Sequence, residues 1–196
     1  MTLDPDPVAG ARQLLGATLA RGTTAVRITE VEAYAGAGDP ASHAFRGPTR
    51  RNAVMFGPAG RLYVYAMHGH FCANVICTPQ GVGGGVLIRA GEVVEGIEHA
   101  RERRPGVADP KLARGPGNLT RALGISLADN GAELLTGDSA VQVRLATIGP
   151  GHVSAGPRVG VSRAADVAWR FWVTGDPSVS AYRPARTIVR PGPGSE

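Results

Sequence analysis

Residues 61–78, RLYVYAMHGHFCANVICT, contain two runs of β-branched and aromatic residues on either side of Gly69. Runs of this kind around a glycine predict a β-hairpin with its tip near residues 67–70. The hairpin carries several flat side chains, namely Tyr63, Tyr65, His68 and His70. Such a ribbon suits a tip that enters a nucleic-acid groove. It equally suits a tyrosine-rich sheet core, and the hairpin alone leaves both interpretations open.

The flanking sequence predicts further short elements. Asp6-Pro7 is a helix-start pair, and an amphipathic helix is predicted from the apolar residues that follow at helical spacing: Val8, Ala11, Leu14, Leu15 and Leu19. Residues 26–33 predict a strand, and the polar loop after it runs to Asn52 and carries His43, Arg46, Arg50 and Arg51. The remaining expected elements are strands at 86–94, 141–146, 158–161 and 170–174 and helices at 94–104 and 116–123.

The length of the chain, 196 residues, suits one domain, and its 28 Gly and 15 Pro predict many turns. We find no repeat and no linker that would divide it. A segment rich in Pro, Gly and Arg begins at about Pro184. We therefore expect one domain over residues 1–183 and a disordered tail over residues 184–196.

The chain is basic, with 21 Lys and Arg against 16 Asp and Glu, a formal net charge of +5 and a pI near 9.9. Every basic residue except Lys111 is arginine, whose planar guanidinium suits phosphates and base edges. This balance favours a polyanionic partner. A basic soluble protein without such a partner would have the same composition.

Cellular location is an expectation from the N-terminus and the cysteines. The first residues, MTLDPDPVAG, are acidic and interrupted by proline, unlike a secretory leader. Cys72 and Cys77 are the only cysteines, and we expect free thiols in a cytoplasmic, nucleoid-associated protein. No apolar run approaches the length of a membrane span, so no membrane partner is expected.

Two acidic residues are candidates for chemistry. Glu30 and Glu32 lie two positions apart in an otherwise apolar strand, so both should project from one face. A buried carboxylate is costly unless it is paired, so each of them is either functional or part of a structural ion pair, for which Arg89 is a candidate. The residues alone leave this choice open.

Six motifs, taken in order, resemble those of the alkyladenine (3-methyladenine) DNA glycosylase family. They are Glu32-Ala33-Tyr34, His43, Leu62-Tyr63-Val64-Tyr65, Phe71-Cys72-Ala73-Asn74, Val86-Leu87-Ile88-Arg89-Ala90 and Pro157-Arg158-Val159-Gly160-Val161. The resemblance extends from about Ala9 to Tyr182. Six ordered motifs are far more specific than any one of them.

The resemblance implies an α+β fold, a single mixed domain around a curved antiparallel β-sheet with a protruding hairpin that inserts into DNA. It implies a monofunctional DNA glycosylase that flips alkylated or deaminated purines out of the duplex and hydrolyses the N-glycosidic bond, the first step of base excision repair. The expected partner is double-stranded DNA with damaged purines, bound by a monomer. Members of the family use no metal and no cofactor.

The resemblance also implies roles for individual residues. Glu32 corresponds to the general base that deprotonates the attacking water, and Arg89 to the residue that holds Glu32 and the water. The flipped base would lie among Tyr34, His43, Tyr65 and Asn74.

His68 stands where relatives usually have an intercalating Tyr. The chain is one residue shorter than the family pattern between Gly69 and Phe71, so Met67 and His70 remain alternatives for the intercalating residue. Phosphate contacts are expected from arginines in the polar loops, including Arg50, Arg51, Arg101 to Arg104 and Arg114.

Other functions remain as alternatives. A strand would place His68, His70 and Cys72 on one face, as in a zinc site, but Cys77 has the opposite parity and no short Cys or His pair occurs. The signature of zinc deaminases is absent, and acyl or formyl transfer lacks a nucleophile elbow. A non-catalytic relative that only binds damaged DNA is the main alternative. The sequence leaves the range of lesions open.

Overall fold

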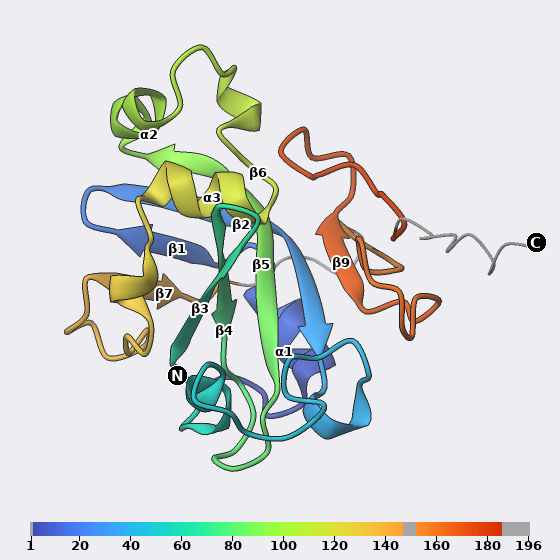
Figure 1. The fold of residues 1–196 in the computed structure, drawn as a ribbon. Coiled ribbons are helices and arrows are strands. Elements are labelled where there is room, and N and C mark those ends of the chain that lie inside the picture. The colour runs from blue at the N-terminus through green and yellow to red at the C-terminus, as the bar shows by residue number, and fades with distance from the viewer. Residues whose placement is uncertain (1, 147–151, 186–196) are drawn as a thin grey trace, which may run out of the picture.

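The computed structural model describes residues 2–146 and 152–185 (Figure 1). Its helices are α1 (Pro7–Leu14), α2 (Ile97–Arg103) and α3 (Pro116–Leu123). Short 3-10 turns are η1 (Gly36–Gly38), η2 (Ala53–Phe56), η3 (Asp109–Lys111) and η4 (Leu127–Asp129). The strands are β1 (Thr18–Arg21), β2 (Thr24–Tyr34), β3 (Leu62–Met67), β4 (His70–Val75), β5 (Gly85–Glu95), β6 (Ala113–Arg114), β7 (Val141–Arg144), β8 (Val153–Gly156) and β9 (Arg170–Val173).

One antiparallel sheet organises the described part of the chain. Its strands follow the order β3-β4-β5-β2-β1-β7, with β6 paired to β5, β9 to β2, and β8 to β9. The register of β2 on β5 shifts around Glu30, and such bulges bend a strand and increase its twist. The sheet therefore curls, and the predicted α+β fold around a curved antiparallel sheet is confirmed.

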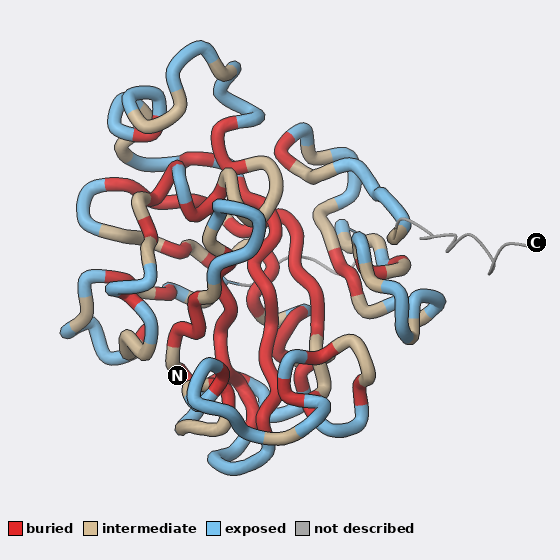
Figure 2. Tube along the Cα trace, in the orientation of Figure 1, coloured by how far each residue is buried: buried red, intermediate tan, exposed pale blue. Residues whose placement is uncertain are grey.

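Helices cover the sheet and close the core. Helix α1 packs on β2 and β5, and α3 packs on β4 and β5 (Figure 1). Figure 2 shows the central strands as a continuous buried layer. Ile28 of β2 and Ile88 of β5 are fully buried in this layer, and so is Leu119 of α3, which packs on it. Within residues 2–146 and 152–185, no helix combines the length and the apolar character that crossing a membrane requires.

The predicted hairpin is confirmed and consists of β3 and β4. Met67 pairs with His70 across the ribbon, so only His68 and Gly69 form the turn. Both have positive φ, 48° and 77°, which a two-residue type I′ turn requires. The one-residue shortening of the sequence therefore corresponds to a very tight tip.

One predicted boundary and one predicted strand are wrong. The first helix does not extend to Leu19, because Gly16 adopts a φ of 78° after the helix ends and Leu19 belongs to β1. Residues 158–161 do not form a strand. Strand β8 precedes them, and Arg158 turns inward to a buried carboxylate. The predicted tail, 184–196, lies outside the described residues from position 186 onward.

A buried ion pair joins two segments that are distant in sequence. The Arg158 guanidinium binds both carboxylate oxygens of Asp39, with Nη2 2.9 Å from Oδ1, and it also donates to the Ala33 carbonyl oxygen. Both side chains are completely buried. The pair fixes the loop after β2 against the segment after β8, and both segments border the site described below.

Asp39→Asn should lower the free energy of unfolding by about 3–5 kcal/mol, because it leaves the Arg158 cation buried without a counter-charge. Urea denaturation measures the change. Asp109→Asn is the matched control, since Asp109 pairs with Arg101 at the surface, and it should leave the unfolding midpoint almost unchanged. Equal effects of the two substitutions would show that the buried pair contributes no more than an exposed one.

Candidate active site

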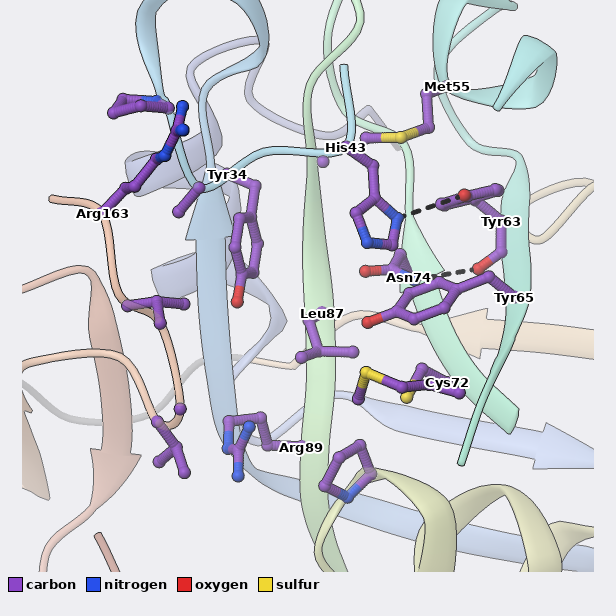
Figure 3. A pocket seen from close by; sticks show the side chains of 18 of the residues that line it. Tyr34, His43, Met55, Tyr63, Tyr65, Cys72, Asn74, Leu87, Arg89 and Arg163 are labelled. Atoms are coloured by element: carbon purple, nitrogen blue, oxygen red, sulfur yellow. Dashed lines mark hydrogen bonds between the residues drawn. The ribbon is translucent and has the colours of Figure 1, made fainter. Parts of the chain in front are cut away.

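A cavity of about 410 Å³ lies between β2, β5 and the hairpin (Figure 3). Five of the predicted site residues line it, namely Tyr34, His43, Tyr65, Asn74 and Arg89. They come from β2, the following loop, β3, β4 and β5, so the curled sheet brings together residues that lie far apart in the sequence.

Aromatic side chains face each other across the cavity. Tyr34 lies on one side, and His43 and Tyr65 lie on the other (Figure 3). The His43 and Tyr65 ring centroids are 4.4 Å apart with planes at 66°, and His43 Nδ1 lies 3.3 Å from the Tyr63 hydroxyl. Partial burial lowers the pKa of His43, and the nearby charge of Arg51 lowers it further. The cavity can therefore hold a flat, apolar-faced group beside a neutral imidazole.

Tyr34 is held from behind. The Arg158 guanidinium lies 4.7 Å from the Tyr34 ring centroid. The phenol donates a 2.9 Å hydrogen bond to Glu32 Oε2. Burial, together with the charge of Glu32, raises the pKa of Tyr34 well above its ordinary value, so the hydroxyl stays a donor.

Glu32 lies directly behind the cavity wall. Its side chain is completely buried and does not itself line the cavity. Glu32 Oε1 accepts a 2.7 Å hydrogen bond from the Val159 backbone N–H, and Arg89 Nε lies 3.4 Å from the same oxygen. Burial raises the pKa of Glu32 above its ordinary value, although the Arg89 charge opposes the shift. The carboxylate behind the cavity wall therefore gains more from accepting a proton than an exposed one does.

Glu30 has a different environment. Its carboxylate accepts hydrogen bonds from Arg89 Nε at 3.0 Å, Arg170 Nε at 2.7 Å, the Ser180 backbone N–H at 2.7 Å and the Ser180 hydroxyl at 2.9 Å. These four contacts satisfy both oxygens. Glu30 is therefore the structural ion pair that the sequence allowed, and Arg89 links it to Glu32.

Asn74 is fixed by its own strand pair. Its Nδ2 donates a 3.1 Å hydrogen bond to the Tyr63 carbonyl oxygen, and its Oδ1 points into the cavity (Figure 3). The orientation of the amide is thus set before anything enters the cavity.

The other predicted residues lie outside the cavity. His68 is exposed at the hairpin tip, whereas Met67 lines the cavity. Arg50 and Arg51 are exposed in the loop beside it. Arg114 is half-buried on β6 and donates from Nε to the Val179 carbonyl oxygen at 2.7 Å.

Sequence reasoning did not assign Tyr63, Met55 and Val159 to the site, although all three line the cavity. Tyr63 shares the parity of Tyr65 on β3, so strand alternation could have found it. Val159 contributes its backbone N–H, which no side-chain pattern reveals. Within the described ranges, no cluster of three His, Cys, Asp or Glu is arranged to hold a metal ion.

Comparisons with known proteins show which proteins this chain resembles. The family model described as methylpurine-DNA glycosylase matches residues 1–177. A protein of Rhodococcus jostii named "Putative 3-methyladenine DNA glycosylase" is 56% identical over 185 residues, which cover 91% of this chain and 82% of the relative. Proteins with the same name from Nocardia farcinica and Mycobacterium tuberculosis are 55% and 52% identical, cover 91% of this chain, and are themselves covered to 88% and 90%.

The His43 imidazole should titrate below the ordinary histidine range, because its cation is partly desolvated and faces Arg51. Arg51→Gln removes one of these two causes and should raise the pKa partway back. NMR titration of the ring protons measures both values. Arg144→Gln is the control, since Arg144 lies on β7 and pairs with Glu95. An unchanged His43 pKa in Arg51→Gln would contradict the charge coupling.

Proposed function

The chain belongs to the methylpurine-DNA glycosylase family, and from that premise we propose that it flips alkylated or deaminated purines out of duplex DNA and hydrolyses their N-glycosidic bond. The observation that carries the proposal is the completely buried Glu32, held directly behind the wall of an aromatic cavity by three groups that line it, Arg89, Tyr34 and the Val159 N–H. A protein that only bound damaged DNA would gain nothing from burying a carboxylate near the phosphates of its partner.

In the proposed reaction, the flipped purine lies between Tyr34 on one face and His43 and Tyr65 on the other. As the bond from C1′ to the base nitrogen breaks, the base leaves with the electron pair and the sugar becomes oxocarbenium-like. The Glu32 carboxylate stabilises that positive charge, then takes a proton from the water that attacks C1′. Arg89 fixes the position of the carboxylate and the water.

Selectivity in this proposal comes from the walls of the cavity. Asn74 lies against the minor-groove edge of the purine, where it leaves no room for the 2-amino group of guanine. A damaged base also pairs and stacks less well, so less free energy is needed to extrude it. The fixed amide of Asn74 supports the first part of this account.

The enzyme is proposed to be monofunctional. A glycosylase that also cuts the strand usually needs an amine that forms a Schiff base. The one lysine, Lys111, lies in η3 and does not line the cavity. The product should therefore be an intact abasic site.

Outside the cavity, we propose that His68 inserts into the space left by the flipped nucleotide and that Arg50 and Arg51 contact phosphates. The exposed tip and the exposed loop support these roles. Arg114 stays a prediction, and it would have to bind phosphate with its N–H groups other than Nε–H. Arg101 is paired with Glu98 and Asp109 and is a weaker candidate.

Glu32→Gln should keep DNA binding and reduce base release by at least about a hundredfold, the usual contribution of general-base catalysis. The measurement is single-turnover release from a duplex with one hypoxanthine or one ethenoadenine, with alkali used to cleave the abasic product. In the wild type, the rate should fall as the pH drops through the raised Glu32 pKa, because only the ionised form is a base.

Glu30→Gln is the matched control. It lies on the same strand and also contacts Arg89, but its loss should reduce base release much less. Equal losses in the two variants, or full activity in Glu32→Gln, would remove Glu32 from the role of base.

His68→Ala should weaken lesion-duplex binding by about 1–3 kcal/mol, the contribution of one base stack, and leave the fold intact because the side chain is exposed. His68→Tyr should restore binding with a larger stacking surface. Titrating a 2-aminopurine duplex reports both affinity and flipping. Wild-type binding and flipping by His68→Ala would transfer the role to Met67 or His70.

A further inference from the structure

A second hollow adjoins the cavity along the edge of β3 that faces away from β4. This β3-edge groove has a volume of about 910 Å³. Its walls are the loop after η1, strand β3, η4 and Arg163. It shares six lining residues with the cavity: Pro40, His43, Tyr63, Tyr65, Met67 and Arg163. Because the two hollows adjoin, their occupants can be neighbouring parts of one chain.

Four of the residues that line this groove are arginines. Arg46, Arg50, Arg51 and Arg163 line it and are all exposed. Among residues 2–146 and 152–185, no carboxylate lies within ion-pair distance of these four arginines. Two exposed arginines elsewhere, Arg101 and Arg144, do have acidic partners, whereas exposed Arg12 and Arg121 have none among the described residues. The groove is therefore an uncompensated positive surface, which favours an anionic occupant.

Large apolar side chains line the same groove. Phe45, Met67 and Leu127 are 38%, 44% and 52% exposed. These are three of the six exposed large hydrophobic residues in the described part of the chain, so they are concentrated here rather than scattered. Arginines alone would suffice to bind phosphates. Exposed aromatic and aliphatic groups among arginines are typical of surfaces on which an unstacked base rests.

The edge of β3 provides a backbone donor as well. The Leu62 N–H donates to the Ala132 carbonyl oxygen at 2.9 Å, and the Val64 N–H to Asn130 Oδ1 at 2.9 Å, so these donors point away from β4. Strand alternation places the Ala66 N–H on the same outer edge, and Ala66 lines the groove. An anionic or carbonyl oxygen in the groove can therefore accept a hydrogen bond from this edge.

We infer that the β3-edge groove binds the nucleotide next to the flipped one on the same DNA strand. Its phosphate lies on the four arginines and its base lies against Phe45 and Leu127. This inference rests on the proposed function, because the flipped nucleotide in the cavity fixes which nucleotide is the neighbour. Phe45 is accordingly a positioning residue that holds the strand beside the cavity.

The test is a double-mutant cycle between Phe45 and the neighbouring base. Affinities are measured in the Glu32→Gln background with hypoxanthine duplexes, so that no base is released during the titration. The neighbour is left intact or replaced by a tetrahydrofuran abasic nucleotide, on the 5′ and on the 3′ side separately. With an intact neighbour, Phe45→Ala should weaken binding on the order of tenfold. When the neighbour on one of the two sides has no base, the substitution should have no further effect.

Val82→Ala is the matched control, since Val82 is 52% exposed and lies outside both hollows. It should change none of the affinities. Leu127→Ala provides a second variant and should couple to the same neighbour as Phe45→Ala. Phe45→Ala losses that are equal with and without the base on both sides would overturn the inference.

The phosphate contacts are tested by salt dependence. Arg50→Gln and Arg163→Gln should each reduce the slope of log affinity against log salt by about 1, whereas Arg144→Gln should leave it unchanged. Unchanged slopes for both groove variants would overturn the phosphate half of the inference. Failure of the proposed function is distinguishable, because it would appear as no base release by the wild type, whatever the couplings in the binding cycle.

Discussion

Two carboxylates buried in the central strand impose the main constraint on this structure. Glu30 and Glu32 are both completely inaccessible to solvent, and burying them without donors would cost more than the fold can supply. Their donors come from β5, β9, the segment around Ser180 and the loop after β8. The distant C-terminal segments must therefore fold back onto β2. Satisfying these two side chains thus holds β5, β9 and the segments after β8 and β9 against β2, beside the cavity.

The two carboxylates accept different numbers of short hydrogen bonds, and this difference leaves Glu32 less well compensated than Glu30. Glu30 has four short hydrogen bonds and a second arginine of its own. Glu32 has two short hydrogen bonds, and its contacts with the shared Arg89 are longer, at 3.4 and 3.5 Å. The Glu32 carboxylate therefore keeps more of the energetic cost of its burial. A proton or a developing positive charge in the cavity would relieve that cost.

The sequence predicted those features that depend on local periodicity or on ordered motifs. Runs of β-branched and aromatic residues predicted the hairpin and β2, and the motifs predicted five residues that do line the cavity. It failed where long-range contacts decide. The segment after β8 has strand-like residues, but Arg158 is drawn to Asp39, 119 positions away, and no strand forms there. The residues alone left the choice between Glu30 and Glu32 open, and only the family resemblance assigned the base to Glu32. The contacts of Glu30 with Arg170 and Ser180 are long-range, and no local pattern reveals them.

The net charge likewise shows that composition alone does not locate a binding surface. A formal charge of +5 only favours an anionic partner, because a net charge does not say where on the surface the positive charge lies. Two groups of arginines differ in their contacts in the folded chain. One group binds carboxylates or backbone carbonyls and holds the sheet and its loops together, as Arg158, Arg170 and Arg114 do. The other group lies without acidic partners among the described residues beside the cavity, as Arg50 and Arg163 do. Four exposed arginines without acidic partners among the described residues line the β3-edge groove, so uncompensated positive charge is concentrated beside the cavity.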